Sequence, residues 1–272
     1  VHTFSGHWDS VVACELTPDG KRLISVGLDH TVRLWDLNSG ALLMHFYGHA
    51  GAAKAVAVTA DGQSLLYATS DHALAIYDLS TGAQQRRLRG HTAAITACAL
   101  HPDGRRVLTA AHDHKLKLWD LSTGEELLTF TGHSGAINDC LISRDGKRAI
   151  SAGWDHSVRI WDLASGRLLH ALHGHGGAVS ALSLLPDDQH VVSGSWDHSL
   201  IVWHMGTGAR QAQCTGHSAP VNGVVVTPDG RFLVSASDDR SLKVWDANSG
   251  KELRTLQGHG AGVKDCALAP DG

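Results

Sequence analysis

The stretch LDHTVRLWD, residues 28–36, contains an aspartate, a histidine and a tryptophan close together. Ser25 stands just before it and His7 lies upstream, so a serine, a histidine and an aspartate occur in one short segment. Such a set suits a catalytic triad, a metal site or a structural network. The stretch returns along the chain in related forms, including HDHKLKLWD at 112–120 and WDHSVRIWD at 154–162. This repetition decides how the set is interpreted.

A period of 42 residues runs through the chain. The dipeptide Gly-His keeps this spacing, with its glycine at 6, 48, 90, 132, 174, 216 and 258. An aromatic residue keeps the same step, at Trp35, Tyr77, Trp119, Trp161, Trp203 and Trp245. The period defines six equal units and a partial one: 6–47, 48–89, 90–131, 132–173, 174–215, 216–257 and 258–272. Self-similarity at such a period is typical of a repeat architecture.

Turn signals divide each unit into four short segments. TPDG at 17–20 and its relatives suit tight turns in which glycine takes a positive φ, although Asp188 replaces that glycine in the fifth unit. NSG at 38–40 and its relatives mark a second hairpin turn. In the first unit we expect strands near 11–17, 22–26, 31–36 and 41–46. Strands at this spacing, without a helical period, predict an all-β antiparallel fold.

Four strands per unit, with Gly-His and Trp-Asp signatures in register, resemble the WD-repeat family of β-propellers, and bacterial WD-repeat domains in particular. The resemblance covers residues 1–272 and implies a single propeller domain of four-stranded antiparallel blades. Six blades are complete, and VHTF at 1–4 and GVKDCALAPDG at 262–272 would supply two strands of a seventh. We therefore expect seven blades with the last incomplete, or a window in a longer array. A closed six-bladed ring is the other alternative.

The Ser-His-Asp-Trp set recurs in five units, with threonine replacing serine once. A catalytic triad needs one site with an oriented nucleophile and base, so a set that returns in nearly every blade favours a structural role. By resemblance to the family, the four side chains form a hydrogen-bonded chain inside each blade. The five tetrads are His7, Ser25, Asp29 and Trp35; His91, Thr109, Asp113 and Trp119; His133, Ser151, Asp155 and Trp161; His175, Ser193, Asp197 and Trp203; and His217, Ser235, Asp239 and Trp245.

The second unit departs from this rule. It keeps His49 and Asp71 but has Tyr67 in place of the small hydroxyl residue and Tyr77 in place of tryptophan. Because Tyr67 is too large for the slot, we expect a broken polar chain and the least stable of the complete blades.

Further histidines and the cysteines also follow the repeat. Five histidines come directly after the aspartate of the tetrad position: His30, His72, His114, His156 and His198. They lie on different blades and cannot converge on one ion, so we expect solvated turn residues and no metal or other cofactor. Four cysteines share one position and are expected to be small buried side chains: Cys14, Cys98, Cys140 and Cys266. Thiols without disulfides favour a reducing compartment, hence the cytoplasm.

Function is sought where the units differ. The residue before each aspartate varies most, and reads Leu28, Ser70, His112, Trp154, Trp196 and Asp238. In the family the loops here share one face, to which Trp8 would also belong. Large aromatic side chains beside a turn are typical interface anchors, although each could instead pack on a neighbouring blade. The predicted partner-binding residues are Trp8, Leu28, His112, Trp154, Trp196 and Asp238.

These observations favour a non-enzymatic scaffold or sensor that binds a protein or peptide on the loop face. The alternative is a small-ligand-binding or enzymatic propeller acting at the mouth of the central channel, where six polar residues of the first strands are expected: Lys54, Asn138, Asp139, Asn222, Lys264 and Asp265. This alternative needs a unique cluster of reactive groups, and the sequence offers none.

Composition excludes several partners. The net charge is −4 with no run of Lys or Arg, so nucleic acid is not expected. No apolar stretch reaches the roughly 20 residues that cross a bilayer, so no membrane partner is expected either. The resemblance to bacterial WD-repeat domains raises the expectation of a fused signalling NTPase or kinase module in the full-length protein.

Overall fold

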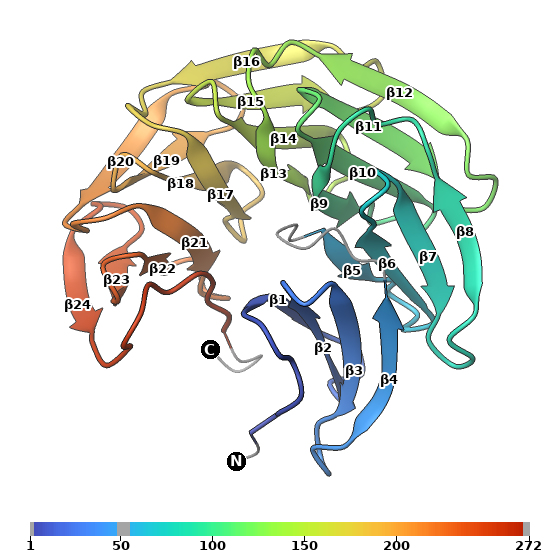
Figure 1. Cartoon of the computed structure of the whole chain (residues 1–272). Helices are drawn as coiled ribbons and strands as arrows, with labels where there is room; N and C mark the ends of the chain where they lie inside the picture. The colour runs from blue at the N-terminus through green and yellow to red at the C-terminus, as the bar shows by residue number, and fades with distance from the viewer. Residues whose placement is uncertain (1–2, 48–54, 269–272) are drawn as a thin grey trace. The chain divides into compact units, whose positions relative to one another are not determined.

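The computed structural model describes residues 3–47 and 55–268 (Figure 1). These residues form strands β1 to β24 and contain no helix. The strands make six four-stranded sheets in which each strand pairs with its neighbour in the chain. The chain divides into two compact units, Val1–Thr129 and Phe130–Gly272, and each is described by itself.

The first unit holds three sheets. The first sheet contains β1 (Val11–Leu16), β2 (Arg22–Gly27), β3 (Thr31–Asp36) and β4 (Leu42–Tyr47). The second contains β5 (Val56–Val58), β6 (Ser64–Ala68), β7 (Leu74–Asp78) and β8 (Gln84–Leu88). The third contains β9 (Ile95–Leu100), β10 (Arg106–Ala111), β11 (Lys115–Asp120) and β12 (Glu126–Thr131), whose last residues pass the unit boundary.

The second unit also holds three sheets. The fourth sheet contains β13 (Ile137–Ile142), β14 (Arg148–Gly153), β15 (Ser157–Asp162) and β16 (Leu168–His173). The fifth contains β17 (Val179–Leu184), β18 (His190–Ser195), β19 (Ser199–His204) and β20 (Arg210–Thr215). The sixth contains β21 (Val221–Val226), β22 (Phe232–Ser237), β23 (Leu242–Asp246) and β24 (Glu252–Leu256).

The prediction of an all-β protein built from four-stranded antiparallel repeats is confirmed, and the four strands of the first unit of sequence lie within about one residue of their predicted bounds. A seventh sheet is not present among residues 3–47 and 55–268. The described parts of the two segments expected to supply it, residues 3–4 and 262–268, form no strand. Whether the two compact units make one domain stays a prediction.

Each sheet packs its apolar face against the next sheet of the same unit. In the second unit, Ile150 and Val158 of the fourth sheet join Val191 and Ile201 of the fifth in one buried cluster. A second cluster joins the fifth sheet to the sixth, and similar clusters join the sheets of the first unit. The sheets pack face to face because burying the apolar side chains of both sheets between them removes these side chains from water.

The turns explain two features of the sequence. The glycines of the PDG turns have φ near +70°, and Asp188 takes the same left-handed conformation with φ of 54°. The carboxylate of Asp188 accepts hydrogen bonds from the amides of Arg144 and Asp145 in the fourth sheet, at 2.9 and 3.0 Å. These bonds offset the backbone strain of a non-glycine residue.

The five histidines that follow the tetrad aspartate all take positive φ, between 59° and 71°. Histidine is among the residues that tolerate this region better than most, which accounts for the row of histidines. Four of the five side chains are exposed, and His198 is partly covered. Each histidine lies in the turn of a different sheet.

Candidate functional site

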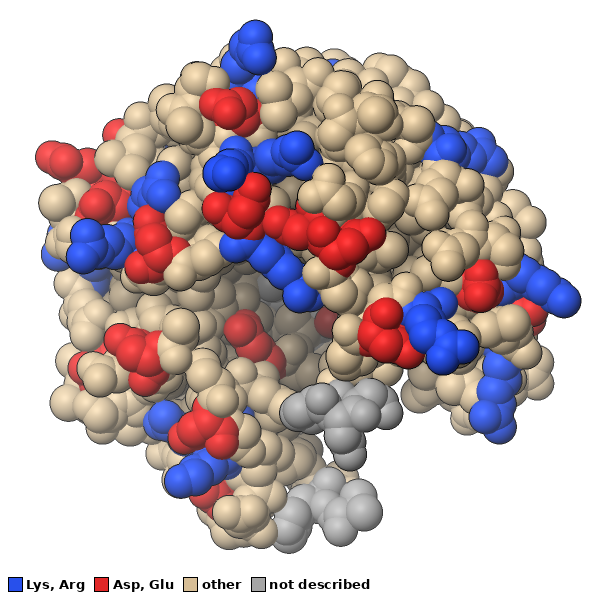
Figure 2. Space-filling model, turned by 180° about the vertical axis from the view of Figure 1, so that it is seen from behind, with Lys and Arg blue, Asp and Glu red and all other residues tan. Residues whose placement is uncertain are grey.

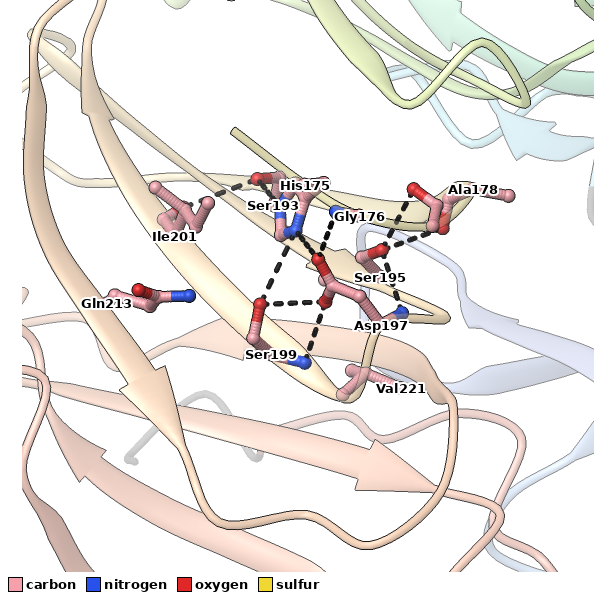
Figure 3. Close-up of polar contacts among 12 residues, drawn as sticks. His175, Gly176, Ala178, Ser193, Ser195, Asp197, Ser199, Ile201, Gln213 and Val221 are labelled. Carbon is pink, nitrogen blue, oxygen red and sulfur yellow. Dashed lines mark hydrogen bonds and ion pairs between the residues drawn. The ribbon is translucent and has the colours of Figure 1, made fainter. Parts of the chain in front are cut away.

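A chain of hydrogen bonds crosses the fifth sheet (Figure 3). The indole Nε1–H of Trp203 donates to Ser193 Oγ at 2.8 Å, and Ser193 Oγ donates to His175 Nε2 at 2.8 Å. His175 Nδ1 in turn donates to Asp197 Oδ2 at 2.8 Å. One carboxylate oxygen also accepts the Gly176 amide at 2.8 Å, and the other accepts the amide and hydroxyl of Ser199.

The same chain occurs in the first, third, fourth and sixth sheets. The shortest distance from histidine Nδ1 to the aspartate lies between 2.6 and 2.9 Å, and that from Nε2 to the hydroxyl between 2.7 and 2.8 Å. The indole donates to the hydroxyl at 2.8 to 2.9 Å. The structure therefore brings together all four members of each of the five predicted tetrads.

The aspartates are held ionised. Burial opposes the charge of Asp113, but hydrogen bonds from His91 and from the Thr92 amide outweigh it and lower the pKa of Asp113 to about 2. Burial lowers the pKa of His217, against the opposing effect of Asp239. In the sixth sheet the network thus favours a neutral His217 imidazole that donates to the Asp239 carboxylate.

The serine, histidine and aspartate have the hydrogen-bond order of a catalytic triad, but the hydroxyl cannot meet a substrate. Thr109, Ser151, Ser193 and Ser235 are completely buried, and each hydroxyl already accepts an indole N–H. A buried polar group without a partner costs about 1–3 kcal/mol, so the arrangement stabilises the sheet that contains it.

The second repeat is built differently. Tyr67 is fully buried and stacks on Tyr77 with ring centroids 5.2 Å apart, and its hydroxyl donates to the Tyr47 carbonyl at 3.1 Å. Asp71 pairs with Arg87 at 2.7 Å and with Arg89 at 2.8 Å. His49 lies outside the described residues. The sheet accommodates the larger ring by aromatic stacking, and its lower stability stays a prediction.

An arginine side chain lies near the aspartate of the tetrad position in several repeats, but in the second repeat this arginine comes from a different strand. In the first and fourth sheets it comes from the third strand, where Arg33 lies 3.5 Å from Asp29 and Arg159 lies 3.5 Å from Asp155. The equivalent residue of β7 is Ala75, and its direct partner across the β7–β8 pair is Arg87. Compared with the fourth sheet, in which Arg159 is paired with Ala171, the small and the long side chain have exchanged strands. This signal is visible in the sequence once the strand register is known.

Backbone hydrogen bonds hold the variable residue that precedes the aspartate of the tetrad position, where most of the predicted partner-binding residues stand. In five repeats the amide of the variable residue donates to a carbonyl just before the first strand of the same sheet, at 2.8 to 3.0 Å. The donors are Leu28, His112, Trp154, Trp196 and Asp238, and their acceptors are Ser10, Ala94, Ala136, Ala178 and Pro220. The loop between the second and third strands is therefore tied to the segment that enters each sheet.

Trp154 and Trp196 come together on neighbouring sheets of the second unit. Their ring centroids are 5.5 Å apart at an interplanar angle of 55°, and the two side chains are 48% and 44% exposed. Trp154 Nε1–H donates to Asn138 Oδ1 at 2.6 Å. A Cβ on Gly177 would lie 2.8 Å from the Asp197 amide nitrogen, so only glycine lets the entering loop approach the backbone beside Trp196.

Asp238, the other candidate in the second unit, has polar partners of its own. Asp238 forms an ion pair with Lys264 at 2.6 Å and accepts Asn222 Nδ2–H at 2.8 Å. Trp8, 74% exposed, belongs to the first unit, as do Leu28, which is half-buried, and His112, which is exposed.

Three of the polar residues expected to face a channel bind the segment that follows their own sheet, and their position at a channel stays a prediction. Asn138 Nδ2–H donates to the Val179 carbonyl at 2.8 Å, and Asp139 Oδ2 accepts the Leu182 amide at 2.8 Å. Asn222 Nδ2–H donates to the Val263 carbonyl at 3.0 Å. Water need not satisfy these groups, because the next segment supplies their partners. Lys54 lies outside the described residues.

The cysteines follow the prediction only in part. Cys140 and Cys214 are buried, Cys98 and Cys266 are partly covered, and Cys14 is exposed. The prediction of a small buried side chain is wrong for Cys14.

Residues 3–47 and 55–268 contain neither a metal-binding cluster nor a membrane-spanning helix. In these ranges no three His, Cys, Asp or Glu side chains are grouped so that they could bind a metal ion. The same ranges contain no helix of the length and apolar character needed to cross a membrane.

Comparison with known proteins agrees with this architecture. The pattern of the family described as "WD domain, G-beta repeat" matches residues 1–36, 82–120, 124–162, 166–204 and 208–246, more than half of the chain. The unmatched residues 37–81 include Tyr67, Asp71 and Tyr77, where the tetrad is replaced.

"Protein groucho" of Drosophila melanogaster is 49% identical to this chain over 43 residues, which cover 16% of the chain and only 6% of groucho. A particular resemblance to bacterial WD-repeat domains is not supported by either match. On the breadth of the family match, the chain belongs to the WD40 repeat family.

Proposed function

We propose that the chain is a non-enzymatic interaction module that binds a protein or peptide partner over the loops carrying Trp154 and Trp196. The observation that carries the proposal is the half-exposed tryptophan pair on two neighbouring sheets. Indole rings provide large contact areas and are enriched among residues that dominate binding energy.

The pair is also held in place before any partner arrives. Asn138 accepts the Trp154 indole N–H and donates its own amide to the Val179 carbonyl, so the ring is anchored to the fifth sheet. A side chain that is already ordered loses less conformational entropy on binding, which favours affinity.

The distribution of charge supports a protein partner over nucleic acid. In Figure 2, Lys and Arg side chains lie beside Asp and Glu side chains over much of the face drawn. Phosphate backbones are bound by surfaces on which positive charge predominates. The buried thiols of Cys140 and Cys214 are in keeping with a cytoplasmic location, which we retain as part of the proposal. A fused NTPase or kinase module stays an expectation.

The test is a peptide selection followed by affinity measurements. Peptides are selected from a random library on the wild-type chain, and their Kd values are measured on Trp154→Ala and Trp196→Ala. We expect each substitution to weaken binding about tenfold or more, because truncating an interface tryptophan removes at least 1.4 kcal/mol.

The matched control is Leu253→Ala, since Leu253 is 49% exposed on β24 and lies outside the tryptophan pair. We expect this variant to bind with unchanged affinity. Failure to select any peptide, or equal affinities for wild type and both tryptophan variants, would place the interface elsewhere or remove the function.

We also propose that residues 259–268 occupy the place of the first strand of a seventh sheet. The Val263 amide donates to the Ser237 carbonyl at 2.9 Å, and its carbonyl accepts from Asn222 as that of Val179 accepts from Asn138. The segment thus meets β21 as β17 meets β13.

The internal repeats provide a test of this seventh sheet. Appending a copy of residues 231–246 after Gly272 adds the second and third strands in the register of the sixth repeat. We expect the melting temperature to rise by several degrees, about 2–4 °C per kcal/mol gained. An unchanged melting temperature would favour a fold that ends with six sheets.

A further inference from the structure

The turn that joins β19 to β20 uses a histidine where the equivalent turns use aspartate. In each of the five other repeats a carboxylate at the end of the third strand accepts at least one amide of the following turn at 2.8 to 2.9 Å. The five carboxylates are those of Asp36, Asp78, Asp120, Asp162 and Asp246. At the same position the fifth repeat has His204.

In the fifth repeat a single ring nitrogen of His204 accepts the hydrogen bonds that a carboxylate accepts in the other repeats. Its Nδ1 lies 3.1 Å from the Gly206 amide, 3.1 Å from the Thr207 amide and 3.2 Å from Thr207 Oγ1. Both backbone groups are donors, so Nδ1 must be the unprotonated acceptor and the ring must be neutral. We name residues 204–209 the His204 turn.

Protonation would remove this acceptor. An imidazolium carries a hydrogen on both ring nitrogens, so Nδ1–H would face two amide N–H groups. An aspartate in the same place remains an acceptor down to much lower pH, and the Ser165 hydroxyl and amide lower the pKa of Asp162 further. The five aspartate turns therefore keep their bonds at a pH at which histidine becomes charged.

Other titratable side chains face the His204 turn from neighbouring strands. His190, its partner across the β18–β19 pair, lies with its ring centroid 5.0 Å away, and His190 Nδ1 is 2.6 Å from Asp187 Oδ2. From β16, His170 Nε2–H donates to the Gly206 carbonyl at 3.1 Å, and Arg210 of β20 follows the turn.

We propose that the His204 turn is an acid-sensitive element, ordered when His204 is neutral and loosened when His204 is protonated. Two backbone bonds between His204 and residues 208 and 209 do not depend on the ring, so the turn loosens while the sheet stays folded. β20 is the outermost strand of the fifth sheet, and Gly206 is the point at which His170 ties this turn to the fourth sheet. Acidification would thus free one end of an edge strand and weaken a link between two sheets.

Amide hydrogen exchange measured by NMR between pH 7.5 and 5.0 tests the proposal on the intact chain. After correction for intrinsic rates, we expect the protection of the Thr207 amide to fall about tenfold more than that of the Ser165 amide, its counterpart in the fourth repeat. Parallel changes at Thr207 and Ser165 would overturn the proposal.

The variant His204→Asp restores the residue of the other five repeats and is expected to remove the difference. His190→Asn removes the ring that packs on His204 but keeps the Nδ1 acceptor, so the acid effect should persist in this variant. Persistence of the acid effect in His204→Asp would also overturn the proposal, because the loosening would then originate elsewhere.

Discussion

Replacing Asp155 by alanine is expected to lower the free energy of unfolding by about 3–5 kcal/mol. The carboxylate accepts hydrogen bonds from the His133 ring, the Ser134 amide and the hydroxyl of Ser157, and it lies 3.5 Å from Arg159. The His133 side chain is fully buried, so alanine would leave a buried donor and a largely covered cation without their acceptor. Urea unfolding followed by tryptophan fluorescence measures the loss.

Asp71→Ala is the matched control, because it removes the aspartate of the second repeat. Asp71 is 37% exposed and pairs with two partly exposed arginines, and such ion pairs contribute about 0–1 kcal/mol. Equal losses for the two variants would contradict the view that the complete tetrad stabilises the sheets that contain it.

Glu15→Gln is expected to stabilise the chain at high pH and to have little effect at low pH. Glu15 is on β1 at a position where the next two repeats have alanine, and its carboxylate accepts a long bond of 3.4 Å from the Val58 amide of β5. Burial raises the pKa of Glu15 to about 7, against the smaller effect of that hydrogen bond. The folded protein therefore prefers the neutral carboxyl group.

The sign of the pH effect follows from this preference. The unfolded carboxyl ionises near its ordinary pKa of 4.5, whereas the folded one keeps its proton to about 7. The contribution of Glu15 to the free energy of unfolding is fully present below pH 4.5 and is lost as the pH rises through 7. With allowance for partial exposure, the loss at pH 8 is about 2 kcal/mol, and glutamine avoids it.

Urea unfolding of wild type and Glu15→Gln at pH 4.5 and pH 8 checks the prediction. The two proteins should unfold at similar urea concentrations at pH 4.5 and at clearly different ones at pH 8. A difference that does not change with pH would mean that Glu15 is solvated like an ordinary surface carboxylate.

The repeat makes much of the fold predictable, since a residue that returns every 42 positions has the same surroundings each time. The tetrads follow from this, because Asp, His, Trp and a small hydroxyl residue keep constant spacing. The glycine turns follow as well, since few residues other than glycine adopt positive φ easily.

The contacts that differ between repeats could not be predicted in the same way. Asp188 binds two amides of the preceding sheet, and Arg87 replaces a cation lost at Ala75 on the neighbouring strand. Both depend on side-chain conformation and on how one sheet meets the next, which a single repeat does not encode. The hydrogen bonds of Asn138 and Asn222 to the segment that follows their sheet belong to the same group of contacts.

The tryptophan pair was predictable as two exposed residues in one column but not as a contact. The column places Trp154 and Trp196 at equivalent points of successive repeats. Their 5.5 Å centroid separation depends on the packing of the fourth sheet against the fifth. Trp8 is also exposed, but it belongs to the first compact unit, whereas Trp154 and Trp196 belong to the second.

The exchange rates of the indole Nε1 protons, measured by NMR, test most directly whether the repeated network maintains the sheets. The account predicts slow exchange for Trp35, Trp119, Trp161, Trp203 and Trp245, whose indole groups donate to buried hydroxyls. It predicts fast exchange for Trp8, which is 74% exposed. Exchange of the five network protons as fast as that of Trp8 would show that the hydrogen-bonded chains do not persist in solution.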